Sequence, residues 1–203
     1  AGDHLFRDGE TSVGSIVETI GGGGANTACI AAGLQARVAF LGAVGDDALG
    51  RRLEQTLIRH GVQAHLARET AVTTGTSVGL TFHSGHRHFI SCLPNTEALR
   101  FEALNLHALA GFTHLYRADI WFCRAMLFGG NERLFREARA RGVTVSIDLN
   151  WDPCWGVARA DEILERKRAV RSVLPWVHLV HGNVRELQEF TDTPDLITAL
   201  RML

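Results

Sequence analysis

The feature that most constrains the fold is a repeated order of elements, in which an amphipathic helix ends at Gly or Pro and an apolar strand follows. Glycine just past a helix end is a common stop signal, and the β-branched runs after it favour buried strands. The predicted pairs are a helix over 48–60 with a strand from 62, 131–141 with 143–149, and 161–174 with 177–181. Helices alternating with apolar strands predict an α/β fold, a three-layer parallel sheet with helices on both faces.

Two segments, 11–20 and 73–93, interrupt this order. Both are rich in Thr, Ser, Val and Gly and modest in apolar content. The first predicts a short strand, and the second predicts an antiparallel hairpin that turns near Ser84 and Gly85. We expect them to form a small β lid over an open cleft, with a simple edge hairpin as the alternative.

Composition excludes several classes of function. A net charge of −1 gives no electrostatic basis for binding nucleic acid or an anionic membrane surface. No apolar run approaches the length that spans a bilayer, so we expect no membrane partner and a cytoplasmic location. The cysteines are widely spaced in mostly apolar segments, as expected for reduced thiols: Cys29, Cys92, Cys123 and Cys154.

A glycine run at 21–24 joins the first of these segments to a helix predicted over 25–33. Glycine permits positive φ and leaves no Cβ between the backbone and a ligand. The following helix N-terminus presents free N–H groups. We therefore expect Gly22, Gly23 and the Asn26 amide to face a polar small molecule, and a flexible turn is the alternative.

Polar residues follow two of the predicted strands. Asp148 and Asn150 end the strand 143–149, and Asn183 and Glu186 follow the next one. Ligands bind at the carboxyl ends of parallel strands, and such oxygen donors suit a hydrated Mg²⁺ ion and phosphates. Each pair also has a structural alternative, because Asp and Asn favour turns and Asn183 with Glu186 fits a capping box.

A third polar segment, Val-Gly-Asp-Asp-x-x-Gly at 44–50, follows the apolar strand that begins at Val38. Its two carboxylates, Asp46 and Asp47, stand directly before the helix predicted over 48–60. Carboxylates at a helix N-terminus accept backbone N–H bonds and oppose the helix dipole. Helix capping is therefore the predicted role of this pair.

These motifs, in this order, resemble those of the ribokinase-like (PfkB) carbohydrate kinases over nearly the whole chain. The glycine run with Asn26, the segment 44–50, Asp-x-Asn-x-x-Pro at 148–153 and Asn-x-x-Glu at 183–186 carry the resemblance. It implies a parallel α/β body, a β lid over a sugar, and transfer of the γ-phosphoryl group of Mg-ATP to a sugar hydroxyl.

The resemblance also implies roles for individual residues. The expected sugar contacts are Gly22, Gly23, Asn26 and Arg124, the last near where the family places an acidic contact, so that it favours an acidic sugar. The nucleotide and phosphate side is expected at Asp148, Asn150, Asn183 and Glu186, with Glu186 acting on Mg²⁺ indirectly. Asp152 stands where many sugar-acid and fructose kinases carry a basic residue, so the resemblance implies a reversed charge at a substrate contact, which would change the sugar that is tolerated.

The sequence departs from the family at both ends. The Gly-Ala-Gly-Asp segment that supplies the catalytic base is absent, and so is the first strand with its sugar-binding aspartate. We therefore expect residues 1–203 to form one incomplete domain that holds no catalytic residue and transfers no phosphoryl group by itself. A homodimer through the lid is a further expectation, because uncovered strand edges tend to pair.

Two other functions remain open on the sequence. A chain without the catalytic segment could serve as a non-catalytic sugar-binding or dimerising module. Alternatively, Gly21-x-Gly23 with Asp46 imitates the fingerprint of an NAD-binding dehydrogenase, although Asn26 stands in place of the third glycine.

Overall fold

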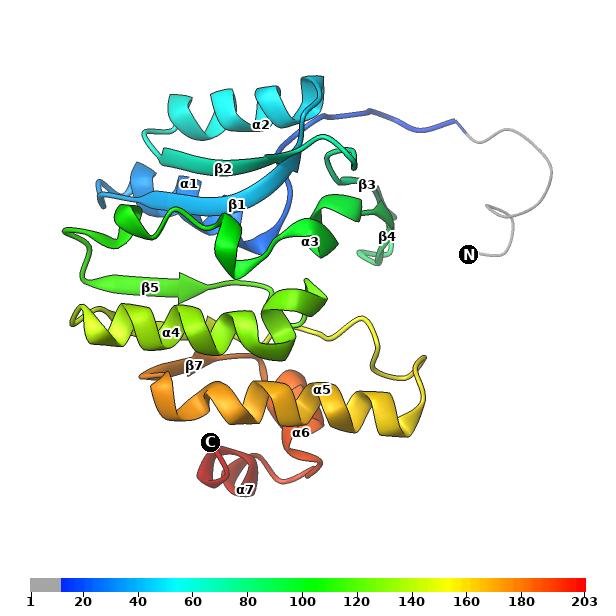
Figure 1. Ribbon diagram of the computed structural model, residues 1–203. Helices are drawn as coiled ribbons and strands as arrows, with labels where there is room; N and C mark the ends of the chain where they lie inside the picture. Colours follow the sequence, from blue (N-terminus) through cyan, green and yellow to red (C-terminus); the bar gives the residue numbers. More distant parts are fainter. Residues whose placement is uncertain (1–11) are drawn as a thin grey trace.

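The computed structural model describes residues 12–203, in which helices and strands alternate as predicted (Figure 1). The first half contains α1 (Gly23–Gly33), β1 (Ala39–Gly45), α2 (Ala48–Arg59), β2 (Gln63–Glu69), β3 (Thr76–Thr81), β4 (Arg87–Cys92) and α3 (Pro94–Ala98). The second half contains β5 (His114–Arg117), α4 (Asn131–Ala140), β6 (Thr144–Asp148), α5 (Ala160–Val173), β7 (Leu179–His181), α6 (Val184–Thr191) and α7 (Leu196–Arg201). Short irregular turns of helix lie at Phe101–Ala103, Leu106–Leu109, Met126–Gly130 and Leu174–Trp176.

The parallel sheet predicted from the sequence is present, in two parts. β1 pairs in parallel with β2, and β5, β6 and β7 form a second parallel sheet in that order. In that sheet Ile147 lies between Arg117 and Val180. Figure 1 shows α1 behind β1, and α4 and α5 in front of the second sheet. Within residues 12–203, no hydrogen-bonded ladder joins β1 to β5, and contacts such as Gly23 with Asp119 and Glu97 with Arg124 connect the two halves.

Each half has its own apolar core. Phe135 of α4 packs with Val145 and Ile147 of β6, and all three side chains are fully buried. The smaller core of the first half is built from Ala25, Ala28, Cys29, Leu57 and Val62. The cysteines are free thiols, as predicted, although Cys92 is exposed. No helix in the part of the chain that the structure describes combines the length and apolar character needed to cross a bilayer.

A buried ion pair fastens α5 to the core. Arg166 donates from Nε to Asp152 Oδ2 (2.7 Å) and from Nη2 to Asp152 Oδ1 (2.9 Å), and Nη2 also reaches the carbonyl of Trp121 (2.7 Å). The Asp152 side chain is completely buried, so it cannot contact a substrate. The substrate role that the resemblance attached to Asp152 is wrong, because the carboxylate turns inward to neutralise Arg166.

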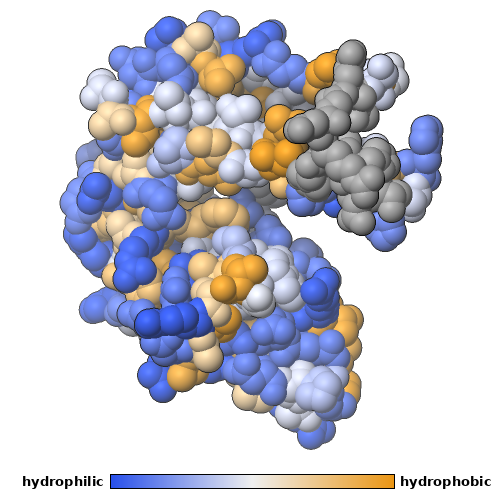
Figure 2. Space-filling view, turned by 90° about the vertical axis from the view of Figure 1, so that its right-hand side faces the viewer, coloured by the Kyte–Doolittle hydropathy of each residue, from blue (hydrophilic) through white to orange (hydrophobic). Residues whose placement is uncertain are grey.

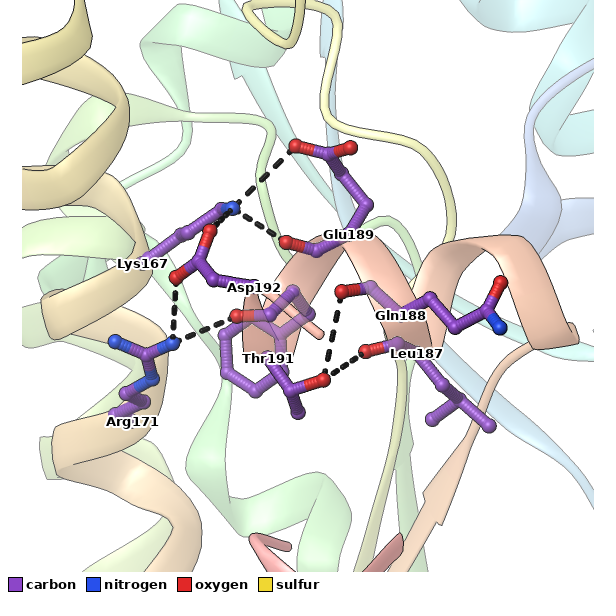
Figure 3. Close-up of polar contacts among 8 residues, drawn as sticks. Lys167, Arg171, Leu187, Gln188, Glu189, Thr191 and Asp192 are labelled. Carbon is purple, nitrogen blue, oxygen red and sulfur yellow. Dashed lines mark hydrogen bonds and ion pairs between the residues drawn. The ribbon is translucent and has the colours of Figure 1, made fainter. Parts of the chain in front are cut away.

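The carboxyl end of α6 is held by two cations of α5 (Figure 3). Lys167 Nζ bonds the carbonyl of Glu189 and Asp192 Oδ1, and Arg171 Nη2 bonds the carbonyl of Phe190 (2.7 Å). Asp192 caps the helix with a left-handed φ of 58°. Positive side chains stabilise the exposed carbonyls at a helix C-terminus. The junction therefore fixes α6, whose opposite end carries Asn183 and Glu186.

The strand predicted over 12–20 does not form, and Thr11 lies outside the described residues. Residues 12–19 are exposed and irregular, and β3 and β4 pair only with each other in the described part of the chain. The apolar side chains of the segment, Val13, Ile16 and Val17, stay exposed, because no strand of the described residues offers it an edge to pair with. The predicted antiparallel hairpin is present, with its turn at Ser84 and Gly85, so of the two segments expected to build a lid only this one forms strands.

The base of the hairpin is pinned to the end of β1 by Asp47. Of the predicted capping pair, Asp47 caps α2, accepting from the Gly50 N–H at 2.7 Å, whereas Asp46 pairs with Arg51. It also accepts from the N–H (2.7 Å) and the hydroxyl (2.8 Å) of Thr74. A Cβ on Gly45 would lie 2.6 Å from the Thr74 nitrogen, so only glycine allows this approach.

These bonds predict a pH-dependent stability. The Thr74 N–H, then the Gly50 N–H, lower the pKa of Asp47 to about 2, whereas an aspartate in an unfolded chain has a pKa of about 3.9. The stabilisation is complete above about pH 4 and is lost as the pH falls toward about 2. We expect Asp47→Asn to reduce the fall in urea midpoint between pH 6 and pH 3. Equal falls in both proteins would contradict this.

Candidate functional site

The N-terminus of α1 is closed by a carboxylate from the other half of the chain. Gly22, the residue before the helix, has φ 90°, a left-handed conformation that glycine adopts without strain. The N–H of Gly23 donates to Asp119 Oδ2 at 3.0 Å. A Cβ on Gly23 would lie 3.0 Å from that oxygen, so a larger residue would crowd the carboxylate. The glycines therefore allow this close contact.

Asn150 binds the other oxygen of the same carboxylate. Its Nδ2 donates to Asp119 Oδ1 at 2.8 Å. Both residues have left-handed backbones, with φ 51° at Asp119 and φ 47° at Asn150. The left-handed backbone conformation is sparsely populated, so holding both Asp119 and Asn150 in it costs free energy. Strained residues of this kind cluster at functional sites. The arrangement places a carboxylate and an amide face to face at the ends of β5 and β6.

Asp148 extends the network toward β7. Its Oδ2 accepts from the Tyr116 hydroxyl at 3.0 Å, and its Oδ1 lies 3.2 Å from both the Asn150 nitrogen and His181 Nδ1. Burial, followed by the Asp148 charge, raises the pKa of Tyr116 to about 12, so the phenol stays protonated as the donor. The resulting group, the Asp119 cluster, consists of Gly23, Tyr116, Asp119, Asp148, Asn150 and His181.

The corner between β7 and α6 follows directly after His181. Asn183 Oδ1 accepts from the Glu186 N–H (3.0 Å), and Glu186 Oε2 accepts from the Asn183 N–H (2.8 Å), which is the predicted capping box. The box engages the single side-chain oxygen of Asn183 and one of the two oxygens of Glu186, and oxygen donors of this kind suit a hydrated Mg²⁺ ion. No group of three or more His, Cys, Asp or Glu residues is arranged to hold a metal within residues 12–203.

Two predicted sugar contacts stand apart from the cluster. Asn26 is exposed one turn further along α1. Arg124 is also exposed, with its guanidinium over the Phe128 ring (4.8 Å to the centroid) and its N–H on Glu97 Oε2 (3.1 Å). These contacts direct Arg124 toward α3, at the exit of the hairpin, rather than toward Asp119.

The surface is hollowed where the strands end. Figure 2 views the molecule from the right-hand side of Figure 1, toward which the strands point, and shows a hollow between an upper and a lower lobe. Sequence reasoning missed Asp119 and Tyr116, which carry much of the cluster. The sequence feature that could have identified Asp119 is its position two residues after the four-residue strand β5.

Comparison with solved structures shows the same fold in several kinases. The fructokinase from Xylella fastidiosa has a TM-score of 0.78 and 20% sequence identity, covering 96% of this chain and 63% of its own. The same protein is also known with bound ATP, with a TM-score of 0.77 and 21% identity, covering 94% of this chain and 62% of its own. Adenosine kinase from Anopheles gambiae has a TM-score of 0.71 and 24% identity, covering 88% of this chain and 56% of its own.

The chain thus spans less than two thirds of the length of these structural relatives. No curated protein sequence matches it. The family model described as pfkB family carbohydrate kinase matches residues 3–203, almost the entire chain. With the motifs and the fold, this match shows that the chain belongs to the pfkB family of carbohydrate kinases.

Proposed function

We propose that the Asp119 cluster is the sugar-binding part of an ATP-dependent carbohydrate kinase. The reaction is transfer of the γ-phosphoryl group of ATP to a sugar hydroxyl. The observation that carries this proposal is the Asp119 carboxylate, which joins the Gly23 amide to Asn150 where the strands end. Family membership supplies the reaction class.

The chemistry of the cluster suits a polyhydroxylated ligand. A carboxylate has about four lone-pair sites, so Asp119 and Asp148 keep acceptor capacity for sugar hydroxyls beyond their internal bonds. Gly22 leaves bare backbone at the edge of the site, because no atom lies within 4 Å of its Cβ position. The Asn26 amide adds both a donor and an acceptor. The hairpin β3–β4 covers the ligand and excludes water.

The nucleotide side is proposed at the β7–α6 corner. Asn183 and Glu186 orient the phosphates, and Glu186 holds Mg²⁺ through water. The ion, when bound, neutralises charge on the phosphates during transfer. Asp148 connects this corner to the sugar side, since it contacts both His181 and Asn150. Asn150 is proposed to serve the sugar side, because its amide is committed to Asp119.

The proposal is tested by titrating the purified chain with fructose, ribose, adenosine and a sugar acid in a calorimeter, without ATP. We expect one of them to bind with a Kd of roughly 1 μM to 1 mM, the usual range of enzyme substrates. Tightest binding of the sugar acid would support the sugar contact at Arg124 that the resemblance implies, although Arg124 lies toward α3 in the structure. Absence of heat with every compound would contradict the sugar site.

The same preparation tests phosphoryl transfer. ADP release with Mg-ATP and the bound sugar, measured against a blank without protein, reports the reaction. The sequence predicts no release by these 203 residues alone. Release above the blank would show that the chain supplies its own base, and binding without release would match the non-catalytic alternative.

We also propose that the hairpin mediates a homodimer. Its strands are exposed on both faces, and Val78, Phe89 and Ile90 are 54%, 62% and 53% exposed. A two-stranded hairpin is only marginally stable in water, so contact with a second copy of the chain stabilises it.

We expect light scattering to show a dimer. We expect Phe89→Ser to weaken this dimer about tenfold or more, because the aromatic ring that the dimer buries is lost. A wild-type monomer at high concentration would contradict the dimer.

A further inference from the structure

Arg117, at the end of β5, has an unusual set of partners. Its Nε donates to Asn131 Oδ1 at 3.0 Å, its Nη1 to the carbonyl of Ala118, and its Nη2 to the carbonyl of Phe122 at 3.3 Å. Within residues 12–203 no carboxylate forms an ion pair with it. Arg117 is half-buried, and burial lowers its pKa because desolvation disfavours the charged guanidinium. Such a cost calls for a role beyond filling space.

The two carbonyls bound by Arg117 stand on either side of Asp119. Asp119 has its left-handed φ of 51°, and its own carbonyl accepts from the Phe122 N–H at 3.0 Å. The guanidinium thus spans the turn 118–122 from one side and joins it to Asn131, which is almost fully buried at the start of α4. A rigid planar group with five donors can hold three acceptors at fixed angles, which a lysine ammonium cannot.

We propose that Arg117 is a positioning residue for Asp119. It holds the strained turn so that the carboxylate meets the Gly23 amide and Asn150 at the same time. The sugar affinity of the cluster then depends on a side chain that does not touch the sugar, a consequence that rests on the proposed function. The predicted effect of Arg117 on the hydrogen bond between Gly23 and Asp119 does not depend on the proposed function.

Arg117→Lys is the direct test, and Arg171→Lys is its matched control. Both arginines bind carbonyls in the second half of the chain, but Arg171 binds the carbonyl of Phe190 and the carboxylate of Asp192 and does not reach the turn 118–122. The readout is hydrogen exchange of the Gly23 amide, measured by NMR in both variants. Loss of the brace should speed that exchange about tenfold, the scale of one hydrogen bond, and weaken the sugar by a similar factor.

In the control variant, we expect the hydrogen-exchange rate of the Gly23 amide to change no more than the exchange rates of core amides in β6. Unchanged Gly23 exchange in Arg117→Lys would overturn the inference, whatever the sugar titration shows. If the wild-type chain binds no sugar while Gly23 exchange still responds, the proposed function fails and the positioning role stands. Should Arg117→Lys not fold, Asn131→Ala removes one anchor of the guanidinium, and faster Gly23 exchange is again required.

Discussion

Replacing Asp119 by asparagine is expected to weaken sugar binding by roughly 100-fold or more, the combined scale of two hydrogen bonds to a charged group. The carboxylate accepts from the Gly23 N–H and from the Asn150 amide. An asparagine must direct its NH₂ group at one of these two donors. The turn then opens, and the charge that attracts sugar hydroxyls is also lost. Calorimetric titration of the sugar into both proteins measures the effect.

The control for this experiment is Asp161→Asn. Asp161 is exposed and pairs with Arg159 across the surface at 2.6 Å, so the substitution removes the same charge far from the cluster. We expect its sugar affinity to equal that of the wild type, because surface ion pairs contribute little. Equal affinity in the Asp119 variant would show that the carboxylate does not contact the ligand.

Removing the buried carboxylate of Asp152 is expected to have the largest effect on stability. Asp152→Ala leaves the Arg166 guanidinium inside the protein with only the Trp121 carbonyl as partner. Breaking a buried ion pair by deleting one member costs about 3–5 kcal/mol, because the remaining charge is uncompensated. We expect urea denaturation to show a loss of this size in the free energy of unfolding.

A double variant separates the charge from the packing. Asp152→Leu combined with Arg166→Met replaces both ions by apolar groups, which is often neutral or stabilising for buried pairs. We expect it to recover most of the stability that Asp152→Ala loses. If the single variant were as stable as the wild type, water would have to reach Arg166, contrary to its burial in the structure.

Much of the fold follows from local sequence patterns. The order of helix, glycine and strand predicted β6 and α4, and the carboxylate before α2 was correctly predicted as its cap. The strand predicted over 12–20 failed because a composition that favours strands does not by itself provide a pairing partner, and the hairpin offers none in the described residues. The division of the parallel sheet into β1–β2 and β5–β6–β7 was not predicted, because the residues of one strand do not specify which distant strand it pairs with.

The site was harder to predict than the fold. The glycines, Asn150 and Asp148 were identified because they follow strands or precede a helix. Asp119 was missed because its bond to Gly23 joins residues 96 positions apart. Asp152 was misinterpreted because the resemblance places it where related kinases carry a basic residue, whereas its actual partner is Arg166, fourteen residues further along the chain.

The contact between Gly23 and Asp119 also has an electrostatic consequence. The amino end of a helix carries a partial positive charge and normally attracts phosphates and other anions. In this chain that pole is already neutralised by an aspartate from the polypeptide itself. A second anion there would be repelled, whereas an uncharged polyol would not. The corner therefore discriminates by charge, and an anionic ligand can bind there only with its charged group turned away from α1.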